Sequence, residues 1–331
     1  MLILSSQRRC ALLALVAALW ACGPRGGASA TPHDAAHGGQ DLAGRLVVYN
    51  AGSLAKPFGD LLKAFHSRHP RVAPAEENSG SLEAARKLTE LGKIPDVIGV
   101  ADYGVIPKLL IPEFATWYAS FATNAMVLAY TDRSTAAAEI NDDNWWRILL
   151  RPGVRSGHSN PALDPNGYRT LMVYQLAERF YHQPGLAERL RRAVPARNVR
   201  PKEVDLTALV QAGELDYAWT YYSVAKTTGL RHVDLPAAIN LSDPSKADWY
   251  AEARVWVPAP GRAARDSVEF VGQPIVYALT IPTAAPHPEV AAAFVHFIFS
   301  PDGQAILRDA GFVVLPKPEL GGPGTPPAGL F

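Results

Sequence analysis

Two junctions in the sequence share one form, in which a strand-like run ends in a turn of small residues and a helix-like run begins. They are Asn50-Ala51-Gly52-Ser53 and Asn78-Ser79-Gly80-Ser81. Glycine lets the backbone approach a ligand, the first turn of a helix has unpaired N–H groups, and a serine hydroxyl can donate a hydrogen bond. Such a junction suits an oxyanion. The alternative is plain N-capping by serine, which needs no ligand, and the sequence leaves both interpretations open.

Two acidic residues form a second candidate pair. Asp164 begins Asp-Pro-Asn-Gly-Tyr-Arg (164–169), and Glu203 lies within Arg-Pro-Lys-Glu-Val-Asp (200–205). An aspartate before a proline is a common helix N-cap, and a glutamate in a first turn suits the helix dipole. The pattern alone therefore favours capping over a ligand-binding role for both acids.

Motifs of hydrolases and of metal or nucleotide enzymes are missing from the sequence. There is no G-x-S-x-G, HExxH or CxxC, and no G-x-G-x-x-G follows a strand-like run. A cell-surface hydrolase built on Ser53 or Ser81 is the alternative from a different functional class. It lacks a basic partner close in sequence, since His66 and His69 lie at or beyond the far end of the helix expected after Ser53. His158 fits a loop residue better than a base.

Composition narrows the class of protein further. The 331 residues are 48% hydrophobic and 19% charged, and 32 Lys+Arg against 31 Asp+Glu give a net charge of +1. This length suggests two domains with real cores, and the charge balance excludes wholesale disorder and nucleic acid as the main partner.

The N-terminus predicts an extracytoplasmic protein. Residues 1–21 have the basic pair, the apolar run and the small-residue end of a signal peptide. The end of this segment, Leu19-Trp20-Ala21-Cys22, resembles a bacterial lipoprotein cleavage box, with Cys22 as the acylated first residue of the mature chain; an ordinary signal peptide is the alternative. Residues 22–43 are rich in Gly, Ala and Pro, which predicts a flexible linker between a lipid anchor and the folded body.

From residue 45 onward, strand-like runs alternate with amphipathic helix-like runs. This alternation is typical of an α/β fold with right-handed βαβ units and a parallel sheet. We expect strands near 46–50, 71–78, 96–101, 125–131, 215–225 and 274–282. We expect helices near 57–69, 81–91, 103–110, 142–150, 169–181, 186–194, 203–212, 288–300 and 301–310. The stretch 235–265 is Pro-rich and has few strand signals.

The order of these runs is consistent with two α/β lobes. A chain that begins one lobe, crosses into the other and later returns would place residues 44–125 and 272–318 in lobe 1 and 126–271 in lobe 2, with 319–331 as a C-terminal tail. Two crossing strands would join the lobes, and hinge motion would close them around a ligand in the interlobe cleft.

Motifs across residues 46–317 resemble those of the tungstate/molybdate-binding proteins of ABC importers. The motifs that carry the resemblance are Ala51-Gly52-Ser53-Leu54, Ser79-Gly80-Ser81, Ala101-Asp102-Tyr103, Ile106-Pro107-Lys108, Pro112-Glu113-Phe114-Ala115, Asn144-Trp145, Ser159-Asn160-Pro161, Asp164-Pro165 with Gly167-Tyr168-Arg169, Gly213-Glu214-Leu215-Asp216-Tyr217 and Ser223-Val224-Ala225-Lys226. The resemblance implies a periplasmic-binding-protein fold of type 2, a monomer that carries no cofactor and is not an enzyme, and an ABC transporter permease as partner.

The resemblance also implies a set of ligand-binding residues. They are Ser53, Ser81, Asp164, Glu203 and Tyr221, with Asp164 and Glu203 bound to the tungsten or molybdenum of the oxyanion. The sequence departs from the family at three places: Asn166 stands where a cysteine is common, Thr227-Thr228 replaces a usual Gln-His, and the stretch between residues 181 and 200 is shorter than in archaeal members.

Two carboxylates beside the bound anion would make the site selective among oxyanions. In a closed, low-dielectric cleft they would repel sulfate, whose sulfur cannot accept further ligands. Tungsten or molybdenum in a tetrahedral oxoanion can accept two more oxygens and become six-coordinate. A receptor for another oxyanion, such as sulfate or phosphate, is the alternative within the class of binding proteins.

Overall fold

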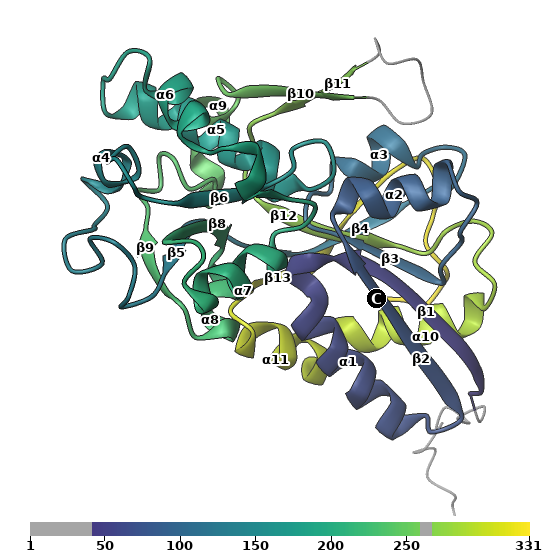
Figure 1. The fold of residues 1–331 in the computed structure, drawn as a ribbon. Coiled ribbons are helices and arrows are strands. Elements are labelled where there is room, and N and C mark those ends of the chain that lie inside the picture. Colours follow the sequence, from purple (N-terminus) through teal and green to yellow (C-terminus); the bar gives the residue numbers. More distant parts are fainter. Residues whose placement is uncertain (1–41, 259–266) are drawn as a thin grey trace, which may run out of the picture. The chain divides into compact units, whose positions relative to one another are not determined.

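Two β-sheets, each packed against helices, organise the protein (Figure 1). The computed structural model describes residues 42–258 and 267–331. The expected signal peptide at 1–21, the expected acylation site Cys22 and nearly all of the expected linker at 22–43 lie outside the described residues. Asp41–Phe331 form one unit by their internal contacts.

The larger sheet has six strands in the order β13-β4-β12-β3-β1-β2. β1 is parallel to β2 and β3, whereas β12 is antiparallel to β3 and β4, and β13 is antiparallel to β4. In this sheet the prediction of parallel strands is therefore right for β1 to β3 but not for β4, β12 and β13, because β4 leaves for the second sheet and β12 returns from it. The elements are β1 (Gly44–Ala51), β2 (Val72–Ser79), β3 (Val97–Val100), β4 (Tyr118–Thr123), β12 (Val276–Thr280), β13 (Val313–Gly321), the 3₁₀ helix η1 (Gly52–Leu54), α1 (Ala55–Arg68), α2 (Ser81–Thr89), α3 (Val105–Leu109), α10 (Pro288–Phe299) and α11 (Pro301–Asp309).

The second sheet has five strands in the order β7-β6-β8-β5-β9. β6 is parallel to β7 and β8, and β5 is antiparallel to β8 and β9. The elements around it are β5 (Met126–Tyr130), α4 (Trp145–Leu149), β6 (Ser156–Ser159), α5 (Pro165–Phe180), α6 (Leu186–Ala193), η2 (Ala196–Asn198), β7 (Val199–Arg200), α7 (Val204–Ala212), β8 (Tyr217–Tyr221), α8 (Tyr222–Thr228) and β9 (Arg231–Asp234).

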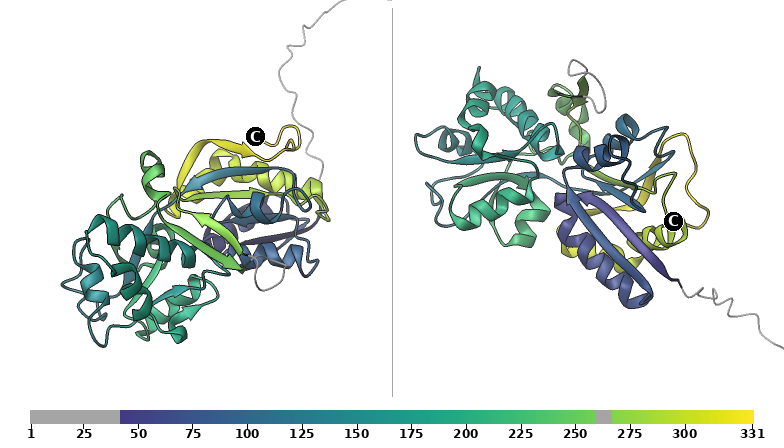
Figure 2. Two further views of the ribbon diagram at one scale, coloured as in Figure 1. Left: turned by 90° about the horizontal axis from the view of Figure 1, so that it is seen from above. Right: turned by 45° about the vertical axis from the view of Figure 1, so that its right-hand side comes forward.

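The chain passes between the two sheets twice. It leaves the larger sheet between β4 and β5, at residues 124–125, and it returns between the ribbon strand β11 (Ser267–Val271) and β12. The lobe boundary expected at 125/126 falls in the first of these crossings. In both views of Figure 2, the teal and green elements of the second sheet group on one side and the purple, blue and yellow elements of the larger sheet on the other.

A two-stranded ribbon occupies the stretch in which the sequence shows few strand signals. β10 (Arg254–Pro258) pairs antiparallel with β11, after η3 (Pro244–Lys246) and α9 (Ala247–Tyr250). The expectation of a strand-poor stretch at 235–265 is wrong at its end. The ribbon is anchored to α5, since Gln175 and Arg254 exchange two hydrogen bonds of 3.0 Å, and to α2, since Arg86 donates to the Pro258 carbonyl at 2.6 Å.

Three boundaries differ from their sequence-based predictions. The strand expected over 215–225 ends at Tyr221, directly before α8, and the helix expected over 142–150 begins only at Trp145, after Asn144. The tail expected from 319 begins later, because β13 pairs with β4 as far as Gly321. Two prolines conceal this strand in the sequence. They lie where the register shifts between Val314 and Glu319, a place at which missing N–H donors are tolerated.

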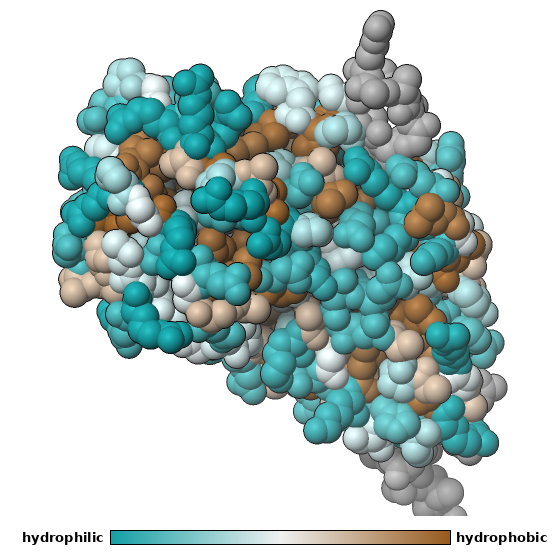
Figure 3. Space-filling view, in the orientation of Figure 1, coloured by the Kyte–Doolittle hydropathy of each residue, from teal (hydrophilic) through white to brown (hydrophobic). Residues whose placement is uncertain are grey.

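Buried hydrophobic side chains fill the space between sheets and helices. The main cluster includes Phe58, Leu61 and Phe65 of α1, which recur at helical spacing and pack toward Phe294 of α10. On the face drawn in Figure 3, hydrophilic residues predominate and hydrophobic ones are scattered in small groups. Within residues 42–258 and 267–331, no single helix has the length and hydropathy to cross a membrane; α10 and α11 together would, but a 65° bend separates them.

Candidate functional site

The twin small-residue junctions lie side by side at one edge of the larger sheet. β1 and β2 are parallel and in register, with Asn50 opposite Asn78 and Ala51 opposite Ser79. Both strands end there, and η1 and α2 begin immediately after them. The two junctions thus share their place in the fold as well as their sequence pattern, and Ser53 and Ser81 lie in adjacent turns.

Neither serine caps its helix. Ser53 lies inside η1, Ser81 is the first residue of α2, and neither N-terminus has a side-chain capping bond. The Ser53 hydroxyl oxygen instead accepts a hydrogen bond from the Tyr277 hydroxyl at 2.9 Å, and that of Ser81 accepts one from the backbone N–H of Ala101 at 2.9 Å. The capping interpretation is wrong for both side chains.

Asp164 and Glu203 are linked to each other. Asp164 caps α5: Oδ1 accepts from the Asn166 N–H at 2.9 Å, and Oδ2 accepts from the Glu203 N–H at the same distance. Glu203 precedes α7 without capping it; Oε1 accepts from the Thr220 hydroxyl at 2.5 Å and from the Tyr221 N–H at 3.4 Å. Capping is thus only part of the role of Asp164, and it does not explain the Glu203 side chain.

The second junction and Asp164 approach each other so closely that only glycine fits between them. The Leu163 carbonyl accepts from the N–H groups of Leu82 and Glu83, at 3.1 and 3.2 Å. A Cβ on Gly80 would lie 2.1 Å from that carbonyl oxygen and 2.9 Å from the Asp164 Cβ. The start of α2, from the larger sheet, therefore packs directly against the start of α5, from the second sheet.

The first junction has a similar neighbour in the segment that carries Glu203. A Cβ on Gly52 would lie 3.4 Å from the Val204 side chain and 3.8 Å from the Lys202 Cβ. Each Gly-Ser junction thus faces the helix start that carries one of the two acids. The Glu203 N–H, bound to Asp164, connects the two halves of this arrangement.

Burial raises the pKa of both carboxyls. Asp164 is 3% and Glu203 1% exposed, so desolvation disfavours their charged forms. The charge of Asp164 raises the pKa of Glu203 further. Two N–H donors and the charge of Arg169 oppose the rise for Asp164, whose pKa remains the lower of the two. The surroundings of the two carboxyls therefore contain too little positive charge to stabilise both ionised forms. A ligand whose central atom is positively charged could supply it.

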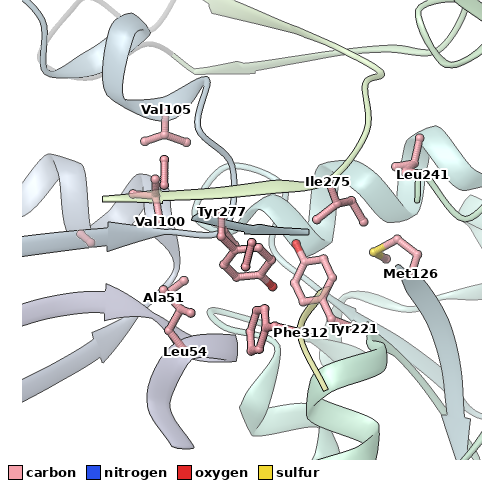
Figure 4. Packing of buried hydrophobic residues seen from close by; sticks show 14 of the residues in the cluster. Ala51, Leu54, Val100, Val105, Met126, Tyr221, Leu241, Ile275, Tyr277 and Phe312 are labelled. Atoms are coloured by element: carbon pink, nitrogen blue, oxygen red, sulfur yellow. The ribbon is translucent and has the colours of Figure 1, made fainter. Parts of the chain in front are cut away.

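Tyr221 lies between the acids and the larger sheet. Its hydroxyl oxygen accepts a hydrogen bond from Arg169 Nη1 at 3.0 Å. Its ring contacts that of Tyr277 at a centroid distance of 5.9 Å, and Tyr277 contacts Phe312 at 4.9 Å (Figure 4). Burial raises the pKa of Tyr221 well above its ordinary value, so the phenol keeps its proton.

Three hydroxyls of the site are left with a proton to donate. Ser53, Ser81 and Tyr221 each accept one hydrogen bond, and none of them donates one to a described residue. A hydroxyl carries one donor as well as its lone pairs. Three buried donors beside two carboxylates can bind the oxygens of an anion whose central atom contacts the carboxylates.

Comparison with known proteins decides the family. The family model of bacterial extracellular solute-binding proteins matches residues 46–313. A solute-binding protein of Petrotoga mobilis is 48% identical over 280 residues, which are 85% of this chain and 87% of that protein. The molybdate/tungstate-binding protein WtpA of Pyrococcus abyssi is 38% identical over 301 residues, covering 82% of this chain and 84% of that one.

The chain belongs to the bacterial extracellular solute-binding proteins. Solved structures agree in fold. The periplasmic molybdate-binding protein of Azotobacter vinelandii has a TM-score of 0.59 at 17% identity, covering 82% of this chain and 100% of that chain. The sulfate-binding protein SubI of Mycobacterium tuberculosis has a TM-score of 0.56 at 15% identity, covering 81% and 86%. These likenesses confirm the predicted α/β fold of periplasmic binding proteins.

The candidate site of this solute-binding protein has further residues that the sequence does not indicate. Tyr277 is the second residue of strand β12, where nothing local suggests a polar role, and Thr220 precedes Tyr221 in a fully buried strand. Asn124 lies at the first crossing, where its Nδ2 contacts the hydroxyls of Ser223 at 2.7 Å and Tyr277 at 3.5 Å. Arg169 does lie in a recognisable motif, but an arginine at that position in a helix would be predicted to be exposed.

The two acids do not belong to a larger cluster of metal ligands. Over the described parts of the solute-binding protein, no group of three or more His, Cys, Asp and Glu could hold a metal ion. His158 lies in strand β6 and is buried, so the expectation of a loop residue is wrong; its Nδ1 lies 2.7 Å from the Ser159 carbonyl oxygen, and burial lowers its pKa.

Proposed function

We propose that this solute-binding protein captures tungstate or molybdate outside the cytoplasm and delivers it to an ABC transporter permease. The observation that carries the proposal is the pairing of three buried hydroxyl donors with two buried carboxylates, of which Asp164 accepts a hydrogen bond from the backbone N–H of Glu203. The ligand set is Ser53, Ser81, Tyr221, Asp164 and Glu203. The 38% identity to the molybdate/tungstate-binding protein of Pyrococcus abyssi supports it.

The chemistry of the ligand explains why donors and acids occur together. The hydroxyls donate to oxyanion oxygens, while Asp164 and Glu203 bind the tungsten or molybdenum atom, which prefers hard anionic oxygen. The metal supplies the positive charge that two buried carboxylates lack. Sulfate offers no such bond, so the same carboxylates repel it.

Hydrogen phosphate is the second candidate ligand. Its P–OH group can donate to a carboxylate, and both Asp164 and Glu203 are available as acceptors in the site. A cell-surface hydrolase lacks support, because the partners of Ser53 and Ser81 are a tyrosine hydroxyl and a backbone N–H, neither of which is a base. The proposed function is binding without catalysis, by a monomer.

We further propose that a lipid on Cys22 anchors the protein to the outer face of the membrane, through the linker at 22–43. The Leu19-Trp20-Ala21-Cys22 box supports this. Cys22→Ser should move the protein from the membrane fraction to the soluble extracytoplasmic fraction, as measured by cell fractionation and immunoblotting. A wild-type protein that is already soluble and begins at another residue would show the anchor to be wrong.

The metal-binding role of the acids is tested by Asp164→Asn and Glu203→Gln. Amides are poorer ligands than carboxylates for a hard, high-valent metal, so tungstate affinity should fall by tenfold or more in each variant. Sulfate affinity should stay the same or rise in the double variant, because the substitutions remove negative charge. Isothermal titration calorimetry with tungstate, molybdate, sulfate and phosphate measures both effects.

Two variants serve as matched controls. Asp243→Asn alters another aspartate that precedes a proline and caps a helix by accepting from residue i+2, and that is not among the proposed ligands. Glu289→Gln alters an exposed glutamate in the first turn of α10. Both should bind tungstate like the wild type. Undiminished tungstate binding in the two site variants would contradict the coordination, and phosphate as the tightest wild-type ligand would favour the second candidate.

A further inference from the structure

Arg169 is a buried cation at the centre of the protein. Of the lysines and arginines in residues 42–258 and 267–331, it alone is buried, with 1% of its surface exposed. It lies on α5, five residues after Asp164. A buried guanidinium needs partners for its charge and its N–H groups, and those partners show what it does.

The partners of Arg169 come from both sheets. Nη1 donates to the Ala101 carbonyl at 2.7 Å and to the Tyr221 hydroxyl at 3.0 Å, and Nη2 lies 3.3 Å from Asp102 Oδ2. Ala101 and Asp102 directly follow β3 of the larger sheet, whereas Tyr221 ends β8 of the second sheet. Asp102 is itself fixed, since Oδ2 accepts from the Tyr168 hydroxyl at 2.5 Å and Oδ1 from the Gly104 N–H at 2.9 Å.

The direction of one hydrogen bond is decided by chemistry. A guanidinium has only donors, so the Tyr221 oxygen must accept from Arg169. The phenol proton is then directed elsewhere, and Tyr221 donates it to no described residue. Arg169 thereby makes Tyr221 a donor toward the ligand.

The same guanidinium reaches the second ligand hydroxyl through one residue. Ala101 accepts from Arg169 with its carbonyl and donates from its N–H to Ser81 at 2.9 Å. A shift of Ala101 would therefore move the group that orients Ser81. One side chain connects a donor from the second sheet with a donor from the larger sheet.

We propose that Arg169 is the positioning residue of the oxyanion site: it fixes Tyr221 as a hydrogen-bond donor and couples it, through Ala101, to Ser81. This inference rests on the proposed function for its ligand. Arg169 also places a positive charge on the helix that Asp164 caps. A lysine would keep that charge but lacks the planar fork that serves several partners at once.

Arg169→Lys keeps the positive charge but removes the guanidinium group that orients Tyr221, so it separates the effect of geometry from that of charge. Tungstate affinity should fall by about tenfold, as for the loss of one hydrogen bond to a charged group. In a Tyr221→Phe background, the same substitution should weaken binding by only about threefold or less, because the hydroxyl that Arg169 orients is already missing. The matched control is Arg179→Lys on the same helix; this exposed arginine pairs with Glu252 at 2.9 Å and should bind tungstate like the wild type.

The result that would overturn the inference is an equal effect of Arg169→Lys in both backgrounds, or no effect in either. If Arg169→Lys does not fold, Asp102→Asn is used instead, because it removes the charged partner of the guanidinium and keeps the size of the side chain at position 102. Asp102→Asn should weaken tungstate binding more in the wild-type background than in the Tyr221→Phe background.

The proposed function and this inference can fail separately. Wild-type titrations with tungstate, molybdate, sulfate and phosphate test the function, and the substitutions are then measured with whichever anion binds. If none binds, the function is wrong. The coupling of Arg169 to Tyr221 is in that case measured by urea unfolding of the ligand-free variants, where purely additive effects on stability would overturn it.

Discussion

At the scale of single residues, hydrogen-bond direction defines the site better than proximity does. Backbone N–H and guanidinium groups cannot accept, so Ser81 and Tyr221 are acceptors toward the protein, and their own protons stay available for a ligand. Ser53 reaches the same state through Tyr277, whose own oxygen faces the Nδ2 of Asn124. The backbone N–H of Ala125 and of Ser223 both donate to Asn124 Oδ1, which fixes the orientation of that amide.

The two serines should therefore contribute separately to binding. We expect Ser53→Ala and Ser81→Ala each to weaken tungstate binding by roughly 1.5 to 3 kcal/mol, the range for a hydrogen bond to a charged group. Ser67→Ala, at an exposed serine of α1 that bonds only the Lys63 carbonyl, is the control and should have no effect. Calorimetry measures all three. Losses of a few tenths of a kcal/mol at both site serines would mean that their free protons do not face the ligand.

The resemblance to the tungstate/molybdate-binding proteins implies the five proposed ligands, whereas residue types and spacing alone leave the serines open and favour capping for the two acids; neither indicates the groups that orient them. Ser53 and Ser81 stand in repeated motifs that sequence comparison can detect. Tyr277 is 224 positions from Ser53, and Arg169 is 68 positions from Ala101. Contacts over such separations depend on how the two sheets meet, and no local pattern encodes them.

At the scale of elements, strand register brings the site together. The βαβ units of β1, β2 and β3 follow from the alternation of runs in the sequence, and the in-register pairing of β1 and β2 places both Gly-Ser junctions at one edge. The sequence does not predict the ribbon β10–β11 or the strand β13. Their strand-like runs are short and contain prolines, at the end of β10 and at the register shift of β13. Glycine at position 80 then allows α2 and α5 to meet.

Gly80→Ala should disrupt that meeting. The new Cβ would lie 2.1 Å from the Leu163 carbonyl oxygen, which is backbone and cannot rotate away, so the starts of α2 and α5 must separate. We expect tungstate affinity to fall by tenfold or more and stability to fall by about 1 to 3 kcal/mol, as in other overpacked sites. Gly59→Ala is the control: it lies within α1, with 3.4 Å to Glu76 Oε2, and alanine should be neutral or stabilise the helix by up to about 1 kcal/mol. Near-wild-type binding by Gly80→Ala would show that the contact can loosen without harm.

At the scale of the whole molecule, the site is shared between the two sheets. Ser53 and Ser81 follow strands of the larger sheet, whereas Asp164, Glu203 and Tyr221 belong to helices and strands of the second. In residues 42–258 and 267–331, two crossings, at 124–125 and 272–275, carry the chain between them. The expected lobes 44–125 with 272–318 and 126–271 would therefore rotate about these crossings, with every proposed ligand contact spanning or adjoining the interface.

Ligand binding should then draw the two lobes together. Without ligand, the approach of the lobes buries two carboxylates that repel each other, which favours a more open arrangement; a bound tungstate compensates their charge and links both sides. We expect saturating tungstate to lower the radius of gyration in small-angle X-ray scattering and to raise the melting temperature, since a ligand at one hundred times its Kd stabilises the folded state by about 2.7 kcal/mol. The Asp164→Asn/Glu203→Gln double variant at the same tungstate concentration is the control. It lacks the proposed metal ligands and binds tungstate more weakly, so both quantities should change much less than in the wild type. Identical scattering profiles for the wild type with and without bound tungstate would show that the ligand enters a body that is already closed, and the hinge would be wrong even if the ligand set is right.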